Sequence, residues 1–346
     1  MHAPESVPAR DALRAALARL LDGLPPSQAA QAVERLITNY RGRTPTDAPV
    51  LRDRSDVAAY AAYRMPATYE AVRAALAAFR ARLPHWVPAH HVDVGGGTGA
   101  ASWAVADAWA GETPGTGAAR GTTVLDWSQA ALSLGEELAA GSGEPALRDA
   151  RWLRQAIDGR LRIEPADLVT ISYVLGELTE ADRGVVVDEA ARAGQAVVIV
   201  EPGTPEGYLR IRAARDRLVA AGLRVVAPCP HSGTCPIEVG SDWCHFAARV
   251  SRSSLHRQVK GGSLPYEDEK FSYVAAVRDL PAPPAAAVDR VVRKPQIRKG
   301  MVLLDLCTGT EGLRRETVTK RHGPAYRAAR DTGWGDEWPP APERDR

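Results

Sequence analysis

Three glycines at alternate positions follow a short apolar run and form the clearest candidate for binding chemistry in the chain. Gly95, Gly97 and Gly99 come directly after the run 91–94, and a helix is expected over 101–110. Glycine is needed where the backbone adopts positive φ or where a ligand approaches too closely for a Cβ atom. The unpaired N–H groups of the following helix point at whatever lies over the turn. Strand, turn and helix together predict a cofactor loop at the first strand of an α/β sheet.

Two cofactor classes fit this loop. Gly95, Gly97 and Ala100 satisfy the dinucleotide pattern G-x-G-x-x-G/A, which is typical of NAD sites. The spacing that begins at Asp93 instead resembles the first motif of class I S-adenosylmethionine (SAM) methyltransferases, Asp-x-Gly-x-Gly-x-Gly. In that class a second acid ends the next strand and holds the ribose hydroxyls, and Asp126 follows the apolar run 122–125. We predict SAM binding, by Asp93, Gly95, Gly97, Gly99 and Asp126.

The cysteines form a second candidate site: Cys229, Cys235, Cys244 and Cys307. The first three have the spacing C-x5-C-x8-C in a polar loop rich in glycine and proline. Thiolates are soft ligands that select zinc or iron–sulfur clusters, and one distant cysteine can complete a set of four. Zinc with three cysteines and a histidine is the rival, because His231 and His245 lie among them, although no C-x2-C pair is present. Buried free thiols are the alternative without a ligand.

Hydrophobic periodicity indicates the elements that position these residues. Strands are expected to alternate with helices from 90 to 200, as in a doubly wound sheet. The expected strands are 91–94, 122–125, 168–173, 196–200, 223–227 and 271–277; the expected helices are 101–110, 129–140, 180–193 and 208–221. The predicted fold is therefore α/β, a class I SAM-methyltransferase (Rossmann-like) doubly wound sheet with N-terminal helices, a cysteine-cluster insertion and a small C-terminal β unit.

Three regions follow from this pattern. Residues 1–83 read as helices, with spans at 11–21, 27–38, 57–63 and 67–83, the last two separated at Pro66 because proline removes a backbone donor. Residues 84–280 form the methyltransferase-like domain, with the cysteine insertion at 228–245. A proline- and alanine-rich linker leads to a basic β unit over 288–346, which carries the fourth cysteine and has strands expected at 290–292, 301–307 and 314–319.

Charge is unevenly distributed along the chain. The net charge is +2, but residues 249–330 contain 17 Lys or Arg against 8 Asp or Glu, and all five lysines lie at or after Lys260. This excess predicts an anionic partner, with nucleic acid the first candidate, and a solvated basic surface is the alternative. The segment 290–299, with five cations, is expected to contact RNA phosphates.

Several classes of protein are excluded by composition. No apolar run approaches the roughly 20 residues of a membrane span, and no signal peptide is apparent. Four cysteines in 346 residues do not make a secreted disulfide scaffold. A cytoplasmic monomer without membrane association is therefore expected.

Separate motifs, in order, resemble one family from about Tyr40 to Trp338. They are Tyr63-Arg64-Met65-Pro66-Ala67-Thr68, Asp93 to Gly99, Tyr173-Val174-Leu175-Gly176-Glu177-Leu178, Glu201-Pro202-Gly203, Cys229-Pro230-His231, Cys235-Pro236, Asp242-Trp243-Cys244-His245-Phe246, Lys294-Pro295, Leu304-Asp305-Leu306-Cys307 and Trp334-Gly335-Asp336. The chain resembles the ribosomal small-subunit-associated methyltransferase-like family. The resemblance implies a SAM-binding fold, a [4Fe-4S] cluster on Cys229, Cys235, Cys244 and Cys307, and binding to small-subunit ribosomal RNA during assembly.

Catalysis is not assigned by these patterns. The motif Asn/Asp-Pro-Pro-Tyr/Phe, which many base-modifying methyltransferases carry after the fourth strand, is absent, and no catalytic base can be named. Ser172, Tyr173 and Glu177 occupy that position and either line the site or cap the next helix. Three functions stay open: an enzyme that methylates ribosomal RNA, a factor that uses the fold as a binding scaffold, and a zinc-bearing small-molecule methyltransferase.

Overall fold

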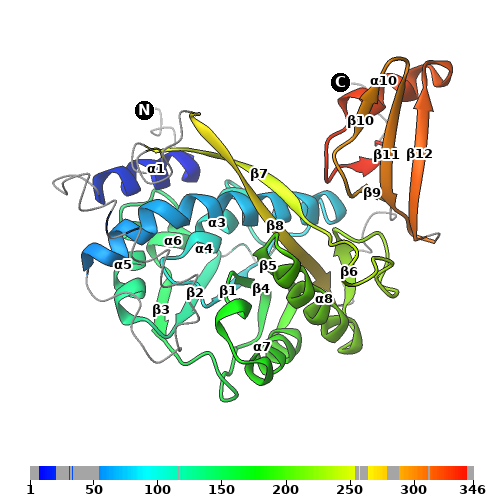
Figure 1. The fold of residues 1–346 in the computed structure, drawn as a ribbon. Coiled ribbons are helices and arrows are strands. Elements are labelled where there is room, and N and C mark those ends of the chain that lie inside the picture. The colour runs from blue at the N-terminus through cyan, green and yellow to red at the C-terminus, as the bar shows by residue number, and fades with distance from the viewer. Residues whose placement is uncertain are drawn as a thin grey trace.

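A computed structural model describes residues 8–20, 31, 33, 54–115, 117, 119–253, 257, 264–278, 288–310 and 312–340. Figure 1 shows a large α/β part crossed by one long helix, and a smaller β unit set beside it and formed by the C-terminal part of the chain. The expected helix over 27–38 lies almost wholly outside the described residues. Among the described helices, none is long and apolar enough to cross a membrane.

The large part is built on a sheet with the strand order β3-β2-β1-β4-β5-β8-β6, and β7 pairs with β8. Strands β3, β2, β1, β4 and β5 are parallel neighbours, and β8 runs antiparallel between β5 and β6. This order is that of the class I methyltransferase fold, so the predicted fold class is confirmed. The strands are β1 (His90–Val94), β2 (Gly121–Asp126), β3 (Arg151–Arg154), β4 (Ala166–Ser172), β5 (Gly194–Pro202), β6 (Arg224–Ala227), β7 (Phe246–Ser251) and β8 (Tyr266–Val277).

Helices cover both faces of this sheet, which explains the continuous apolar runs of its central strands. In β5, Val198 and Val200 face a core shared with α1, α3, α4 and α5, whereas Val197 and Ile199 face a second core with α7 and α8. The helices of the large part are α1 (Ala9–Leu20), α3 (Arg54–Arg82), α4 (Ala100–Ala108), α5 (Gln129–Ala140), α6 (Pro145–Arg148), α7 (Glu180–Ala193) and α8 (Pro205–Ala220); a 3-10 turn follows β4 at Leu175–Glu177.

The predicted break at Pro66 is wrong. Helix α3 runs without interruption from Arg54 to Arg82 and contains Pro66 in its interior. Proline costs a helix about 3 kcal/mol through its lost hydrogen bond and a steric clash. Met65 and Tyr69, on either side of the proline, are both buried in the core that α3 shares with the sheet. We infer that packing along both halves of α3 outweighs the local cost.

Two short strands were not expected from the sequence. Strand β3 exposes most of its side chains and lies at the edge of the sheet, so it lacks the apolar signal of the central strands. Strand β7 pairs with the N-terminal half of β8, in a register from Phe246↔Phe271 to Ser251↔Tyr266. As a result β8 begins at Tyr266, five residues before the predicted strand, and Figure 1 shows the β7–β8 pair extending along α3.

The C-terminal unit is a separate five-stranded sheet in the order β10-β11-β9-β13, with β12 on the other side of β11. Its core combines alternate residues of β11 with the helix and the final strand, through Val302, Leu304, Leu306, Ala329 and Trp338. The elements are β9 (Asp289–Val291), β10 (Gln296–Arg298), β11 (Met301–Cys307), β12 (Leu313–Thr319), a 3-10 turn at Lys320–His322, α10 (Pro324–Asp331) and β13 (Glu337–Trp338). Strands β10 and β13 and helix α10 were not expected.

Candidate functional site

The glycine loop joins β1 to α4 as predicted. Gly95, Gly97 and Gly99 all have positive φ (65°, 53° and 84°), a region that other residues enter at a cost. A Cβ at Gly95 would lie 2.3 Å from a methyl group of Val174, and one at Gly99 would lie 2.7 Å from the ring of Trp152. These two glycines are therefore required by packing, whatever the ligand.

Gly97 differs, because its surroundings are open. A Cβ there would meet a single neighbouring atom within 4 Å, Asp126 Oδ2 at 3.9 Å. The Gly97 N–H donates to that same oxygen at 2.9 Å, and Ser128 N–H donates to Oδ1 at 2.7 Å. Burial raises the pKa of Asp126, and the backbone donors from Ser128 and Gly97 oppose the rise. Gly97 and the second acid, 29 residues apart, thus form one site at the carboxyl ends of β1 and β2.

Asp93 lies below this loop and not at its surface. Its side chain is fully buried, and its two oxygens accept hydrogen bonds from Ser102 Oγ at 3.0 Å and Thr170 Oγ1 at 2.8 Å. His91 Nε2 is 2.8 Å from the same Thr170 hydroxyl. Burial raises the pKa of Asp93 to about 6, against the effect of the hydrogen bonds from Thr170 and Ser102. Asp93 therefore connects β1 to β4 and α4 and fixes the base of the loop.

Acidic groups continue around the strand ends. Glu201, at the end of β5, receives Arg210 Nε at 2.6 Å and the Leu175 N–H at 2.9 Å. Glu177 exposes its side chain to solvent in a crowded position. Surrounding protein atoms, and then the charges of Asp126 and Glu201, raise the pKa of Glu177 to about 7. Such a carboxyl can exchange a proton near neutral pH.

Tyr173 occupies the position where many base-modifying methyltransferases carry the Pro-Pro motif, and its φ of 60° is unusual for a residue other than glycine. Its hydroxyl donates to Glu269 Oε1 at 2.9 Å. The Arg64 guanidinium lies 5.4 Å from the centre of the tyrosine ring and 3.2 Å from the same carboxylate. The sequence indicated Tyr173 as a possible site residue, but it gave no signal for Glu269 or for the contacts that join α3, the end of β4 and β8. Met65 on α3 also accepts from Thr98 Oγ1 at 3.5 Å, so α3 contacts the glycine loop.

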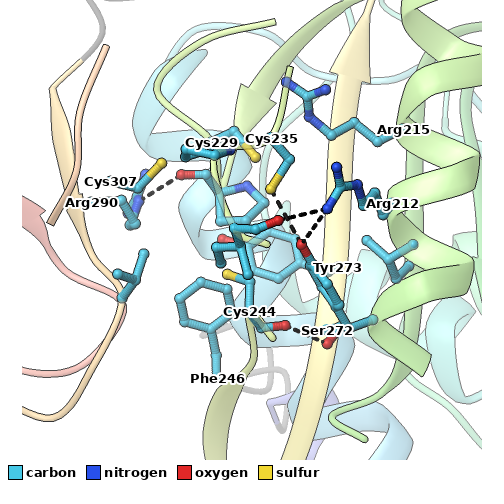
Figure 2. Close-up of a pocket in the computed structure, with 16 residues that line it drawn as sticks. Arg212, Arg215, Cys229, Cys235, Cys244, Phe246, Ser272, Tyr273, Arg290 and Cys307 are labelled. Atoms are coloured by element: carbon cyan, nitrogen blue, oxygen red, sulfur yellow. Dashed lines mark hydrogen bonds between the residues drawn. The ribbon is translucent and has the colours of Figure 1, made fainter. Parts of the chain in front are cut away.

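All four cysteines line one cavity of about 40 Å³, as the sequence predicted for a shared site. Figure 2 shows Cys229, Cys235 and Cys244 from the large part and Cys307 from the C-terminal unit around this space. None forms a disulfide. The cavity thus lies where the cysteine insertion meets the end of β11, and α8, β8 and β9 complete its walls.

Cationic side chains surround the cysteines. Arg212 and Arg215 of α8 line one side, and Arg290 of β9 lines the opposite side (Figure 2). Burial raises the pKa of the Cys229 and Cys244 thiols, and raises that of Cys307 to about 12. Arg215 opposes the shift at Cys229 and Cys307. The thiols of Cys229, Cys244 and Cys307 are therefore neutral when unbound, and the positive charge of the arginines favours an occupant that carries net negative charge.

The two nearby histidines differ in position. His231 Nε2 is 3.9 Å from Cys307 Sγ, whereas the His245 ring stacks on Trp243 at 5.2 Å and meets the edge of Trp334 at 4.7 Å. Within the described parts of the chain, no three His, Cys, Asp or Glu side chains stand close enough together to hold a single metal ion. The cysteines share a cavity without converging on one point.

The basic segment 290–299 divides into two groups. Arg290 is buried and donates to Pro228 O, Gly335 O and Glu337 Oε1 at 3.0, 2.9 and 3.2 Å, and Arg293 pairs with Asp242. These two cations therefore connect the C-terminal unit to the cysteine insertion, and the contact of the segment with RNA phosphates stays a prediction for its exposed cations. The exposed cations of the segment are Lys294, Arg298 and Lys299.

Comparison with known proteins agrees with the expected family. The model of the family described as mitochondrial small ribosomal subunit Rsm22 matches residues 54–339. The human protein named ribosome assembly protein METTL17, mitochondrial, is 32% identical over 297 residues, which cover 81% of this chain and 62% of that protein. Rsm22-cox11 tandem protein 2, mitochondrial, of Schizosaccharomyces pombe is 27% identical over 187 residues, which cover 42% of this chain and 25% of that protein.

Solved structures resemble the large part at low identity. A magnesium protoporphyrin IX methyltransferase from Synechocystis, crystallised with SAM, is 12% identical with a TM-score of 0.39, over 80% of this chain and all of that one. The chain spans about three fifths of the human relative's length and a quarter of the yeast relative's. The family match, by contrast, includes the long helix, the glycine loop, the cysteine insertion and the C-terminal unit. The chain belongs to the Rsm22 family.

Proposed function

We propose that this protein binds SAM in the glycine loop and acts on the small ribosomal subunit, by binding its ribosomal RNA during assembly. The observation that carries the proposal is the family match over residues 54–339, which spans both the loop and the basic C-terminal unit. The description of the family names the mitochondrial small ribosomal subunit, and the name of the human relative refers to ribosome assembly. Four free cysteines agree with a reducing compartment such as the cytoplasm.

SAM is supported over NAD by the strand order, because β8 runs antiparallel between β5 and β6 as in the class I methyltransferase fold. The Asp126 carboxylate lies under the open face of Gly97, where it accepts the backbone N–H groups of Gly97 and Ser128 and can also accept a ribose hydroxyl. The N-terminus of α4 adds a favourable field for the cofactor's carboxylate. Calorimetry with SAM, S-adenosylhomocysteine and NAD tests this step. Binding of NAD without binding of either SAM or its product would contradict it.

The cysteines are proposed to hold a [4Fe-4S] cluster, with Cys229, Cys235, Cys244 and Cys307 as ligands. Mononuclear zinc requires four donors within about 2.3 Å of one point, whereas each cysteine of a cubane cluster binds its own iron and the sulfurs stay further apart. The placement of all four cysteines on one cavity supports a shared group, and the resemblance described above implies that this group is the cluster and not zinc. When bound, the cluster supplies a cross-link between the two parts of the chain and a one-electron redox centre.

The donor set and its surroundings fit such a group. Four thiolates around a cluster carry net negative charge, and Arg212, Arg215 and Arg290 lie along the same cavity. Protein purified without oxygen is expected to contain about four irons and four sulfides per chain. Stoichiometric zinc without iron or sulfide would contradict the cluster and leave an RNA-binding protein with structural zinc.

RNA binding is proposed for the exposed face of the C-terminal unit. Lys294, Arg298 and Lys299 lie on or beside the edge strand β10, whose side chains are all exposed. Arg290 and Arg293 anchor β9 to the cysteine insertion, and β11 joins β9 to β10, so the exposed cations lie on a sheet that is fixed to the rest of the chain.

Methyl transfer distinguishes an enzyme from a protein that uses the same fold only to bind RNA. Incubation of the protein and labelled SAM with small-subunit RNA separates the two roles. Incorporation of label shows an enzyme, and RNA binding without incorporation shows an assembly factor. Methylation of small molecules alone would favour the third function.

A further inference from the structure

Helix α8 presents one polar face to the cysteine insertion. Tyr208, Arg212 and Arg215 are spaced by four and three residues, so they lie along the same side of the helix. Tyr208 and Arg215 are only 4% and 3% exposed. Arg215 donates to His231 O at 3.0 Å, and Arg212 donates to Ile237 O at 2.7 Å. Figure 2 shows both arginines reaching from α8 toward Cys229 and Cys235.

Tyr208 is the residue of this face whose side chain contacts a cysteine sulfur, that of Cys235. Its hydroxyl oxygen is 3.3 Å from Cys235 Sγ, and Arg212 Nη1 is 3.5 Å from the same oxygen. A guanidinium can only donate, so Arg212 occupies a lone pair of the tyrosine oxygen. A metal-bound thiolate has no proton and can only accept. With Cys235 bound, the chain of donors therefore runs in one direction, from Arg212 to Tyr208 to the sulfur.

A second tyrosine of the same cavity, Tyr273, makes no such hydrogen bond to a cysteine sulfur among the described residues. Tyr273 is 5% exposed and lines the cavity, as Tyr208 does. Among the hydrogen bonds found between described residues, the Tyr208 hydroxyl is the tyrosine group that reaches a cysteine sulfur. The cavity thus contains a matched pair of buried phenols, one bonded to a candidate ligand and one not.

We propose that Tyr208, oriented by Arg212, donates a hydrogen bond to the Cys235 thiolate of the bound cluster, raises its reduction potential and slows loss of iron at that ligand. The inference rests on the cluster proposed above. Hydrogen bonds to ligand sulfurs are one of the means by which a protein sets a cluster's potential. Tyr208 is a positioning and tuning residue in this proposal, not a ligand.

The redox step is a one-electron transfer from an electrode to the oxidised cluster. No bond forms or breaks, and the added charge is shared by the cluster and its thiolate sulfurs. A hydrogen-bond donor stabilises the more negative state more strongly. Replacement of Tyr208 by phenylalanine should therefore shift the oxidised-to-reduced ratio at a fixed potential by roughly tenfold toward the oxidised form, or about 59 mV for a one-electron couple.

The experiment compares the full chain, Tyr208→Phe and Tyr273→Phe, all purified without oxygen and matched for iron and sulfide. Potentials are measured by spectroelectrochemical titration, and iron loss by its rate of transfer to a ferrous chelator. We expect a lower potential and faster iron loss in Tyr208→Phe, with Tyr273→Phe equal to the unchanged protein. Loss of the cluster from Tyr208→Phe alone, with the fold retained by circular dichroism, would support the same conclusion.

Two results would overturn the inference, and they differ in what else they affect. Equal potentials and equal iron loss in all three proteins, each with an intact cluster, would refute the role of Tyr208 and leave the proposed cluster standing. Absence of iron and sulfide from the unchanged protein would refute the cluster itself, and the role of Tyr208 with it. An equal shift in Tyr208→Phe and Tyr273→Phe would show a general effect of cavity polarity, against a specific hydrogen bond.

Discussion

Replacement of Arg290 by methionine tests whether the two parts of the chain are held together as the structure indicates. The guanidinium is 5% exposed, and its three nitrogens donate to Pro228 O, Gly335 O and Glu337 Oε1. Methionine keeps most of the aliphatic volume but removes the charge and every donor. Two carbonyls and one carboxylate then lose a buried partner, while Arg82 Nη1 remains 3.6 Å from Glu337.

The expected cost can be estimated from these contacts. Breaking a fully buried ion pair by removing one partner destabilises a protein by about 3 to 5 kcal/mol, and the Glu337 side chain, which is 26% exposed, places this pair toward the lower end. The remaining contact from Arg82 favours the lower end, about 3 kcal/mol. At 1.4 kcal/mol for each factor of ten, local opening of the C-terminal unit should become roughly a hundredfold more frequent.

Native-state hydrogen exchange measures this opening directly. The Val291 N–H, bonded to Asp336 O, and the Gly335 N–H, bonded to Val291 O, join β9 to the segment before β13 and should exchange about a hundredfold faster in Arg290→Met. Arg298→Met is the matched control, because Arg298 is exposed and bonds only Gln296 among the described residues. Equal exchange of both amides in Arg290→Met and the unchanged protein would refute the assigned role of Arg290.

Three further predictions concern the cofactor loop, the core and the basic surface. Gly97→Ala places a methyl group over Asp126 and should weaken SAM binding at least tenfold in calorimetry. Gly111 has a similar positive φ and open space around it, so Gly111→Ala is the control and should leave SAM binding unchanged. Equal loss of SAM affinity in the two variants would point to backbone strain alone. Burial lowers the pKa of His91 to about 3 from its usual 6.5, so the unfolded chain takes up the extra proton and stability falls as pH drops below 6.5. Between pH 7 and pH 5 the protonation of His91 should lower the free energy of unfolding by about 2 kcal/mol. Denaturant titrations of His91→Asn should lack that decrease, and equal pH dependence in the variant and the unchanged protein would contradict the prediction. A third variant replaces the exposed cations of the basic segment with Gln: Lys294, Arg298 and Lys299. The slope of log affinity for RNA against log salt concentration should then fall in magnitude by about two units. The control replaces three exposed arginines in and after α6 and β3 with Gln, which removes the same charge: Arg148, Arg151 and Arg160. Equal salt slopes for the two triple variants would refute the proposed RNA-binding surface.

The sequence predicted the parts of this fold that are locally encoded. Central strands bury both faces and appear as apolar runs, and the helices at Gln129–Ala140 and Glu180–Ala193 have side-chain caps at Ser128 and Thr179. The loop at Gly95 to Gly99 was recognisable because positive φ restricts the residue type. Each of these features depends on neighbours in the chain.

Features that depend on distant contacts were not predictable. Helix α3 passes through Pro66 because it packs on the sheet along its whole length, and Arg290 turns inward because Pro228, Gly335 and Glu337 surround it. The bond from Tyr208 to Cys235 joins residues 27 positions apart with no spacing rule. The cofactor role of Asp93 stays a prediction, although the structure places its carboxylate beneath the loop.

The affinity of the anaerobically purified chain for small-subunit ribosomal RNA, compared with large-subunit RNA fragments of equal length at the same salt, tests the central claim most directly. Phosphate contacts alone bind both RNAs alike, so preference requires a recognised site on the small subunit. We predict at least tenfold tighter binding to the small-subunit RNA, measured at a salt concentration where non-specific binding is weak. Equal affinity for the two RNAs would contradict a specific role at the small subunit.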